Sequence, residues 1–219
     1  MEVILMRKLL GANDQLAKKN REYFNKRNIL AVNLMGSPGS GKSTLISAVA
    51  KKLPGIRIGV IEGDISSSID AERMEREGLP STQINTGGEC HLDAQVIRQG
   101  AEKLNLENAI VFIENVGNLI CPAEFDLGES VRLLAASVPE GDDKPFKYVP
   151  MFSYIDAVAL TKCDLADAVG FDKRHFLKGL RAVSKAPVFE VSLKQGAAEH
   201  GADAVADWLK EKYEAFQES

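Results

Sequence analysis

Short apolar runs rich in β-branched residues alternate with amphipathic segments along most of the chain. The apolar runs occupy residues 29–35, 56–62, 109–115, 131–138, 156–161 and 187–192. Several are apolar on both faces, which is typical of strands buried in a parallel sheet. Helical spacing of apolar residues is found at 42–53, 69–77, 91–104, 172–183 and 198–216. This alternation predicts an α/β fold: a doubly wound, mainly parallel sheet with helices on both faces.

The N-terminal segment has the same helical periodicity, with lysines and arginines between its apolar positions. We expect a helix over residues 1–27, followed by the alternating segment at 29–217. No internal repeat, low-complexity tract or clear linker divides the chain, and 219 residues are enough to bury one core. We therefore expect a single domain over residues 1–219.

Composition and charge argue against several classes of protein. The net charge of −4 is unlike that of a nucleic-acid-binding protein, which usually carries a basic excess. No apolar run approaches the ~18 residues that cross a bilayer, and the run VILM near the N-terminus is too short for a signal peptide. Three cysteines do not predict a disulfide framework. We expect a cytoplasmic protein with reduced thiols, and neither nucleic acid nor membrane as a partner.

The strongest motif is GSPGSGKST at residues 36–44, which fits GxxxxGK(S/T) between a predicted strand and a predicted helix. Glycines let backbone N–H groups surround phosphate oxygens, and the helix start adds partial positive charge. Lys42 would reach the β- and γ-phosphates, and Ser43 would bind Mg²⁺. The predicted nucleotide contacts of this P-loop are Gly36, Ser37, Gly39, Ser40, Gly41, Lys42, Ser43 and Thr44.

The base is indicated by ALTKCDL at residues 159–165. The carboxylate of Asp164 can accept both the N1–H and the amino group of guanine, whereas the N1 lone pair of adenine would repel it. The pattern is similar to the NKxD motif of GTPases, with Thr161 in place of asparagine and the Lys162 stem over the purine. The segment VSLKQG at 191–196 resembles the loop whose backbone contacts guanine O6. We expect GTP and GDP as ligands, with further contacts from Ser192, Leu193 and Lys194.

The segment ENVG at 114–117 ends a predicted strand and has the form ExxG, where GTPases carry DxxG. We expect the Glu114 carboxylate near Mg²⁺ and the Gly117 N–H facing the γ-phosphate. Asn118 follows, in place of the glutamine that positions water in Ras-like proteins. Another group must therefore orient the water, or turnover is slow.

Two aspartates in EGDISSSIDAERM are candidates for placing Mg²⁺ or water. Asp64 ends the second predicted strand, and Asp70 opens a predicted helix. Asp70 could equally be a helix N-cap. The predicted catalytic residues are Lys42, Asp64, Asp70 and Glu114, and the predicted Mg²⁺ ligands are Ser43, Asp64 and Asp70.

A second kind of metal site is suggested by NTGGECHLDA, where Cys90 and His91 are adjacent, and by Cys121, four residues beyond Gly117. All three could gather near the γ end of the nucleotide. Two thiolates and an imidazole suit Zn²⁺ or Ni²⁺. Three ligands leave the site incomplete, so a second copy of the chain, a water or a partner must complete it. Spacing alone favours the other interpretation, a buried cysteine beside a surface histidine.

Several motifs taken together resemble the HypB family of hydrogenase nickel-incorporation GTPases. They are GSPGSGKST, NTGGECHLDA, IENVGNLICPAEFDLGE, EGDDKP and TKCDLADAVG. The resemblance runs from about residue 21 to residue 211. It implies a P-loop GTPase that forms a homodimer with nucleotide and metal, and that helps deliver Ni²⁺ to the large-subunit precursor of [NiFe]-hydrogenase. The metallochaperone HypA is the usual partner in such proteins.

The resemblance also assigns roles to particular residues. It implies that Cys90, His91 and Cys121 form a Ni²⁺ or Zn²⁺ site shared across the dimer. It matches Lys147 to a lysine that touches guanine bound in the other subunit, although Lys147 could also be an ordinary solvated lysine. The sequence does not choose nickel over zinc, because the same ligands serve both ions.

The chain also departs from the resemblance. Many relatives carry an N-terminal Cys-rich or His-rich tract, but the first cysteine here is Cys90, so we expect no nickel storage. His175 and His200 stand alone on predicted helices and are expected at the surface, and Cys163 is expected to be structural. The alternatives are a urease accessory GTPase, whose Cys-Pro-His motif lacks its histidine here, a small-molecule kinase, and a purely structural metal protein.

Overall fold

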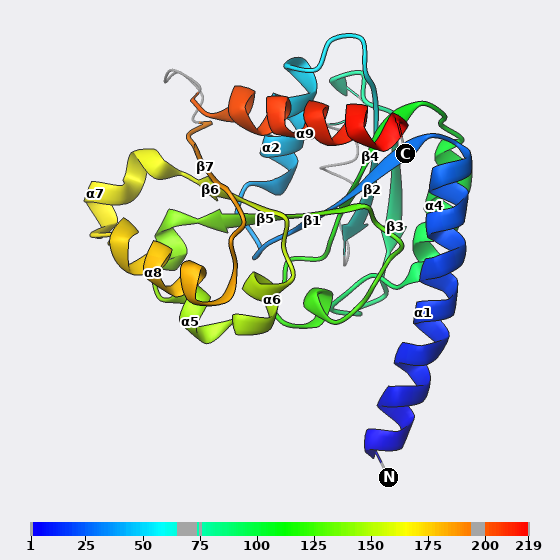
Figure 1. Ribbon diagram of the computed structural model, residues 1–219, viewed down its shortest axis with the longest axis horizontal. Coiled ribbons are helices and arrows are strands. Elements are labelled where there is room, and N and C mark those ends of the chain that lie inside the picture. The colour runs from blue at the N-terminus through cyan, green and yellow to red at the C-terminus, as the bar shows by residue number, and fades with distance from the viewer. Residues whose placement is uncertain (1, 65–73, 75, 194–199, 219) are drawn as a thin grey trace.

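The computed structural model describes residues 2–64, 74, 76–193 and 200–218, and its centre is a seven-stranded sheet (Figure 1). The strands are β1 (Ile29–Met35), β2 (Arg57–Asp64), β3 (Ser81–Asn85), β4 (Ala109–Glu114), β5 (Val131–Ser137), β6 (Ala157–Thr161) and β7 (Val188–Val191). Their order is β3-β2-β4-β1-β5-β6-β7, and every neighbouring pair is parallel. The predicted α/β class is therefore confirmed.

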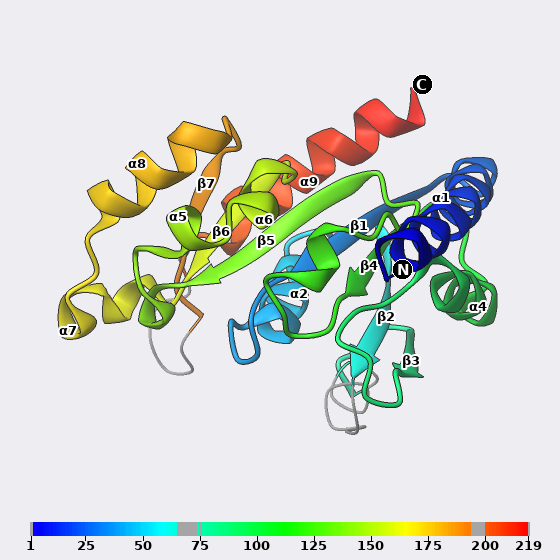
Figure 2. The same ribbon diagram turned by 90° about the horizontal axis from the view of Figure 1, so that it is seen from below.

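Helices cover both faces of this sheet. They are α1 (Glu2–Lys26), α2 (Lys42–Lys51), α4 (Ala94–Leu104), α5 (Lys144–Lys147), α6 (Val149–Ser153), α7 (Ala166–Val169), α8 (Lys173–Val183) and α9 (Ala202–Gln217). One face packs on α2 and α9, and the other packs on α1 and α4 near β4 and on α6 and α8 near β6. Figures 1 and 2 both show α1 and α4 side by side at the end of the sheet away from α8.

Most element boundaries agree with the sequence pattern, and the exceptions have physical reasons. β3 was not predicted because its sequence, STQIN, is polar and the strand lies at the sheet edge. α4 begins at Ala94, later than predicted, because the Asp93 side chain accepts a hydrogen bond from Val96 N and caps the helix. The helix predicted at 69–77 lies mostly outside the described residues.

The C-terminal helix also begins later than the periodicity predicts. The expectation that His200 is helical is wrong: its backbone pairs with Ser192 in an antiparallel bridge. Gly201 follows with a φ of 84°, and α9 starts at Ala202. Among the described residues, none of the helices is both long enough and apolar enough to cross a bilayer.

The parallel arrangement brings the sequence motifs to one edge of the sheet. The carboxyl ends of β1, β2, β4 and β6 lie at this edge, which is where open α/β sheets bind ligands. The P-loop follows β1, the ExxG segment begins at the last residue of β4, and the TKxD motif begins at the last residue of β6. Segments that are far apart in sequence therefore border one site.

Candidate functional site

The P-loop joins β1 to α2 and curls around its own lysine. Gly41, at φ 92°, is the N-cap of α2, and it takes a left-handed conformation that glycine adopts without strain. Lys42 is buried, and its Nζ donates to the carbonyl oxygens of Gly36 and Ser37, at 3.3 Å each. The ammonium group is thus held over the loop where the predicted phosphates would lie.

A cavity of about 520 Å³ opens beside this loop and contains two buried carboxylates; we call it the phosphate cavity after its predicted ligand. Glu62 of β2 and Glu114 of β4 are register partners on neighbouring strands, and both line the cavity. The Ser43 hydroxyl donates to Glu114 Oε1 at 2.9 Å. Two adjacent buried carboxylates repel one another, so a bound cation would stabilise them. Hydroxyl and carboxylate oxygens are hard donors that fit Mg²⁺.

The predicted acidic residues are only partly placed by the structure. Glu114 lies at the cavity, and Asp64 ends β2 as expected. Asp70 lies outside the described residues. Glu62 was missed, although an acidic residue at the end of the mainly apolar run IRIGVIE was a usable signal.

A second cavity, of about 380 Å³, adjoins the first and is lined by the predicted base motif; we call it the base cavity. Both cavities are lined by Gly41, Thr44 and Lys162. Asp164, Thr161 and Leu193 line the second, whereas Lys194 lies outside the described residues. Together the two cavities lie where the P-loop and the base motif predict that the phosphates and the base of a nucleotide bind.

Hydrogen bonds tie the base motif to the P-loop. Thr161 Oγ1 donates to the Ser40 carbonyl at 2.7 Å, and Lys162 Nζ donates to the Gly39 carbonyl at 2.7 Å. Asp164 N donates to Ser192 Oγ at 3.1 Å. These bonds fix the orientation of the loop that presents the Asp164 carboxyl, so Thr161 supplies a link to the P-loop.

Lys147 does not approach these cavities in its own chain. It lies in α5 with its side chain 61% exposed, forms an ion pair with Asp143, and is absent from the described linings of both cavities. The hydrogen bond with Asp143 raises the pKa of Lys147. Within one chain, Lys147 is therefore a solvated lysine.

The predicted thiol and imidazole ligands come together at the surface. Cys90 Sγ lies 3.0 Å from Cys121 Sγ and 3.7 Å from His91 Nδ1, and the ligand atoms all lie within 4.8 Å of one another. The hydrogen bond that Cys90 donates to Cys121 raises the pKa of Cys90. Because Cys90 is exposed, the alternative of a buried cysteine beside a surface histidine is wrong. The cluster is open, so a further ligand can reach it.

The remaining histidines and cysteine are separate from this cluster. His175 and His200 are both exposed, and the His175 ring stacks on Phe146. Cys163 is half-buried, and its Sγ donates to the Leu160 carbonyl at 2.9 Å. Burial raises the pKa of the Cys163 thiol. These contacts agree with a structural role for Cys163.

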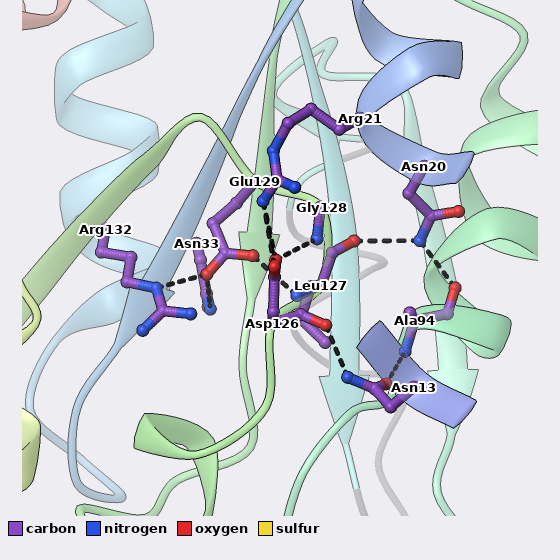
Figure 3. A network of polar contacts seen from close by, with 10 residues as sticks. All are labelled: Asn13, Asn20, Arg21, Asn33, Ala94, Asp126, Leu127, Gly128, Glu129 and Arg132. Atoms are coloured by element: carbon purple, nitrogen blue, oxygen red, sulfur yellow. Dashed lines mark hydrogen bonds and ion pairs between the residues drawn. The ribbon is translucent and has the colours of Figure 1, made fainter. Parts of the chain in front are cut away.

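The helix α1 holds the segments that follow His91 and Cys121 in the chain (Figure 3). Asn20 Nδ2 donates to the carbonyls of Ala94 and Leu127, at 2.7 and 2.9 Å. Asn13 Oδ1 accepts from Ala94 N at 2.9 Å, and Arg21 pairs with Asp126 at 2.9 Å. His91 and Phe125 precede these two segments in the chain, and their rings stack with centroids 3.8 Å apart.

The phosphate loop at the carboxyl end of β1 places the chain among the P-loop nucleotide-binding proteins. Residues 30–190 match the family described as CobW/HypB/UreG, nucleotide-binding domain. The hydrogenase maturation factor HypB of Escherichia coli is 43% identical over 204 residues, which cover 92% of this chain and 70% of that protein. The probable HypB of Methanocaldococcus jannaschii is 41% identical over 92% of this chain and 91% of its own length. The chain belongs to the CobW/HypB/UreG family and, within it, to the HypB hydrogenase maturation factors.

Solved structures agree with this assignment. HypB from Helicobacter pylori, crystallised in complex with nickel, superposes with a TM-score of 0.88 at 34% identity. The match covers 93% of this chain and 96% of that one. The predicted resemblance to HypB is thus confirmed.

Proposed function

We propose that the chain is a GTP-hydrolysing metal-delivery protein that assists nickel insertion during [NiFe]-hydrogenase maturation. The observation that carries this proposal is the hydrogen bond from Asn118 to the Cys90 carbonyl, which joins the Cys90, His91 and Cys121 cluster to the residue after Gly117, a residue that lines the phosphate cavity. Residues 115–118 also connect the cavity to the cluster along the chain, because Asn115, Val116 and Gly117 line the cavity and Cys121 follows closely. A nickel complex of the related Helicobacter pylori protein supports Ni²⁺ as the cargo.

In this proposal the P-loop binds the phosphates of GTP and GDP, and Asp164 selects guanine. Lys42 places positive charge against the β- and γ-phosphates. Mg²⁺ would be held by Ser43 and Glu114, with Glu62 nearby, and when bound it supplies positive charge at the same phosphates. We assign Asp64 and Asp70 to Mg²⁺ or water placement. Turnover is slow, because Asn118 replaces the water-positioning glutamine.

The exposed three-ligand cluster is completed by a second copy of the chain. GTP and metal therefore favour a homodimer, in which Lys147 contacts guanine bound to the partner subunit. A zinc ion would fit the same ligands as nickel. The metallochaperone HypA and the hydrogenase large-subunit precursor are the proposed partners before and after metal transfer.

The test measures GTP hydrolysis, metal per chain, and mass in solution with GDP and with a non-hydrolysable GTP analogue. We expect a metal-containing dimer with the analogue. Cys90→Ala and Cys121→Ala should each lose the bound Ni²⁺ or Zn²⁺, whereas Cys163→Ala, the matched control, should keep it. Lys42→Ala should abolish hydrolysis. Metal binding that ignores both cluster cysteines, or a nucleotide that leaves mass unchanged, would contradict the proposal.

A further inference from the structure

Two asparagine side chains form hydrogen bonds with the backbone on either side of His91. Asn118 Nδ2 donates to the Cys90 carbonyl at 3.3 Å. Leu92 N donates to Asn115 Oδ1 at 3.4 Å. The Cys90–His91 dipeptide is therefore held by the side chains of Asn115 and Asn118, which we call the clamp. Both belong to a single segment, which borders the phosphate cavity.

One half of this clamp is anchored to the sheet. Asn115 is buried, and its Nδ2 donates to Asn33 Oδ1 of β1 at 3.1 Å. Asn33 in turn donates to Glu129 Oε1 at 3.3 Å, and Glu129 pairs with Arg132, as Figure 3 shows. Because each of these groups has a buried or partly buried partner, Asn115 holds the Leu92 amide at a fixed position relative to β1.

The other half is attached to the P-loop. The backbone of Asn118 pairs with Gly36 in an antiparallel bridge. The preceding Gly117 lies against Pro38, so closely that a Cβ there would be 2.7 Å from the proline ring. A displacement of the P-loop must therefore displace Asn118.

The Asn118 side chain is engaged with both cysteine loops. Besides the bond to Cys90, its Oδ1 accepts from Ile120 N at 2.8 Å, next to Cys121. An amide with these two bonds is oriented toward the metal loops. The residue at the position of the water-positioning glutamine is therefore used for a different purpose.

We propose that Asn118 is a positioning residue that couples the nucleotide state to the metal site, with Asn115 as the fixed half of the clamp. The inference rests on the proposed function, because it requires both ligands to bind. When the P-loop and Gly117 respond to the γ-phosphate, Asn118 shifts the Cys90 carbonyl while Asn115 holds Leu92. The geometry of Cys90 relative to His91 then differs between the two nucleotide states, and so does metal affinity.

The test compares Ni²⁺ affinity in the two nucleotide states by competition with a chelator of known affinity. Full-length protein is saturated with GDP or with a non-hydrolysable GTP analogue. For the wild type we expect dissociation constants that differ at least about fivefold. Asn118→Ala should reduce this ratio to below about twofold, and nucleotide affinity without metal should stay near the wild-type value. Asn25→Ala, the same substitution on the exposed face of α1, should keep the wild-type ratio.

A second variant separates the two hydrogen bonds of Asn118. Asn118→Asp keeps an acceptor for Ile120 N but removes the donor to the Cys90 carbonyl, so it should lose the coupling as well. A wild-type ratio in both Asn118 variants would overturn the inference alone. A wild type that binds no metal would instead overturn the proposed function. A general loss of affinity with the ratio kept would assign Asn118 a merely structural role and overturn the inference.

Discussion

Thr161 and Lys162 hold the loop that carries Asp164 against the P-loop, and Ser192 Oγ accepts from Asp164 N. The Asp164 carboxyl therefore has a defined position in the base cavity. A carboxylate in this position matches the two adjacent donors of guanine. Adenine would leave the carboxylate without those donors, and an unsatisfied charged group costs more than a lost neutral hydrogen bond.

We predict that Asp164→Asn lowers GTP affinity at least about 100-fold, since an amide cannot accept from both donors of guanine. The variant should gain affinity for xanthosine triphosphate, whose C2 carbonyl can accept from the new amide N–H. Displacement of a fluorescent nucleotide measures both effects. Asp167→Asn, on the exposed surface of α7, is the matched control and should bind GTP like the wild type. Unchanged GTP affinity in Asp164→Asn would contradict guanine selection by this carboxyl.

Single residues were predictable where a motif fixes both the residue type and its place. Lys42, Ser43 and Asp164 belong to such motifs, and the structure places all three at the cavities. Glu62 and Asn115 were not predicted, because their surroundings come from neighbouring strands and from buried side chains such as Asn33. Nothing local in the sequence specifies those partners.

Among the elements, α1 holds in place the two segments that follow His91 and Cys121. Its Arg21 and Asn20 bind the turn at residues 126–128 and the start of α4. Burial disfavours ionisation of Asp126, but the Gly128 N–H and the Arg21 guanidinium outweigh it, so the pKa of Asp126 is below its ordinary value. The charged carboxylate therefore stabilises the contact between α1 and the turn at residues 126–128.

We predict that Asp126→Asn lowers the free energy of unfolding at pH 7 by about 1 kcal/mol, a modest figure because both partners are partly exposed. A depressed pKa means that the contribution is fully present above the unfolded value of about 3.9 and is lost as pH falls through the folded value. The difference between variant and wild type should thus vanish in strong acid. Urea unfolding across pH measures it, with the exposed Asp14→Asn as control. A difference that persists in strong acid would contradict this account.

Long elements were predictable from periodicity, and short ones were not. β1 has the predicted limits, and α1 has the predicted helical extent over its described residues. The short helices α5, α6 and α7 have four or five residues each, too few to establish a period. Periodicity predicts which face of α1 is apolar, but the partners of its buried asparagines depend on how α1 packs on α4.

For the whole molecule, a parallel sheet explains why three motifs and the Cys90, His91 and Cys121 cluster meet at one edge. The common edge of the three motifs was predictable because each motif follows or ends a predicted strand, whereas spacing alone did not predict the cluster. The link between the two sites did not follow, because it depends on the pairing of Gly36 with Asn118 across the chain. The same sheet also joins α1 to α9 through its opposite faces. Any unit that includes the sheet therefore includes both helices.

We predict that residues 1–219 unfold as a single domain. Trp208, the chain's one tryptophan, lies on α9, whereas α1 supplies much of the helical circular dichroism from the other face. Urea transitions followed by Trp208 fluorescence and by circular dichroism should coincide. GDP with Mg²⁺ at 100 times its dissociation constant should raise both free energies of unfolding by about 2.7 kcal/mol. If circular dichroism were lost at lower urea than fluorescence, or if GDP shifted only one probe, α1 would be a separate unit and could not hold in place the segments that follow His91 and Cys121.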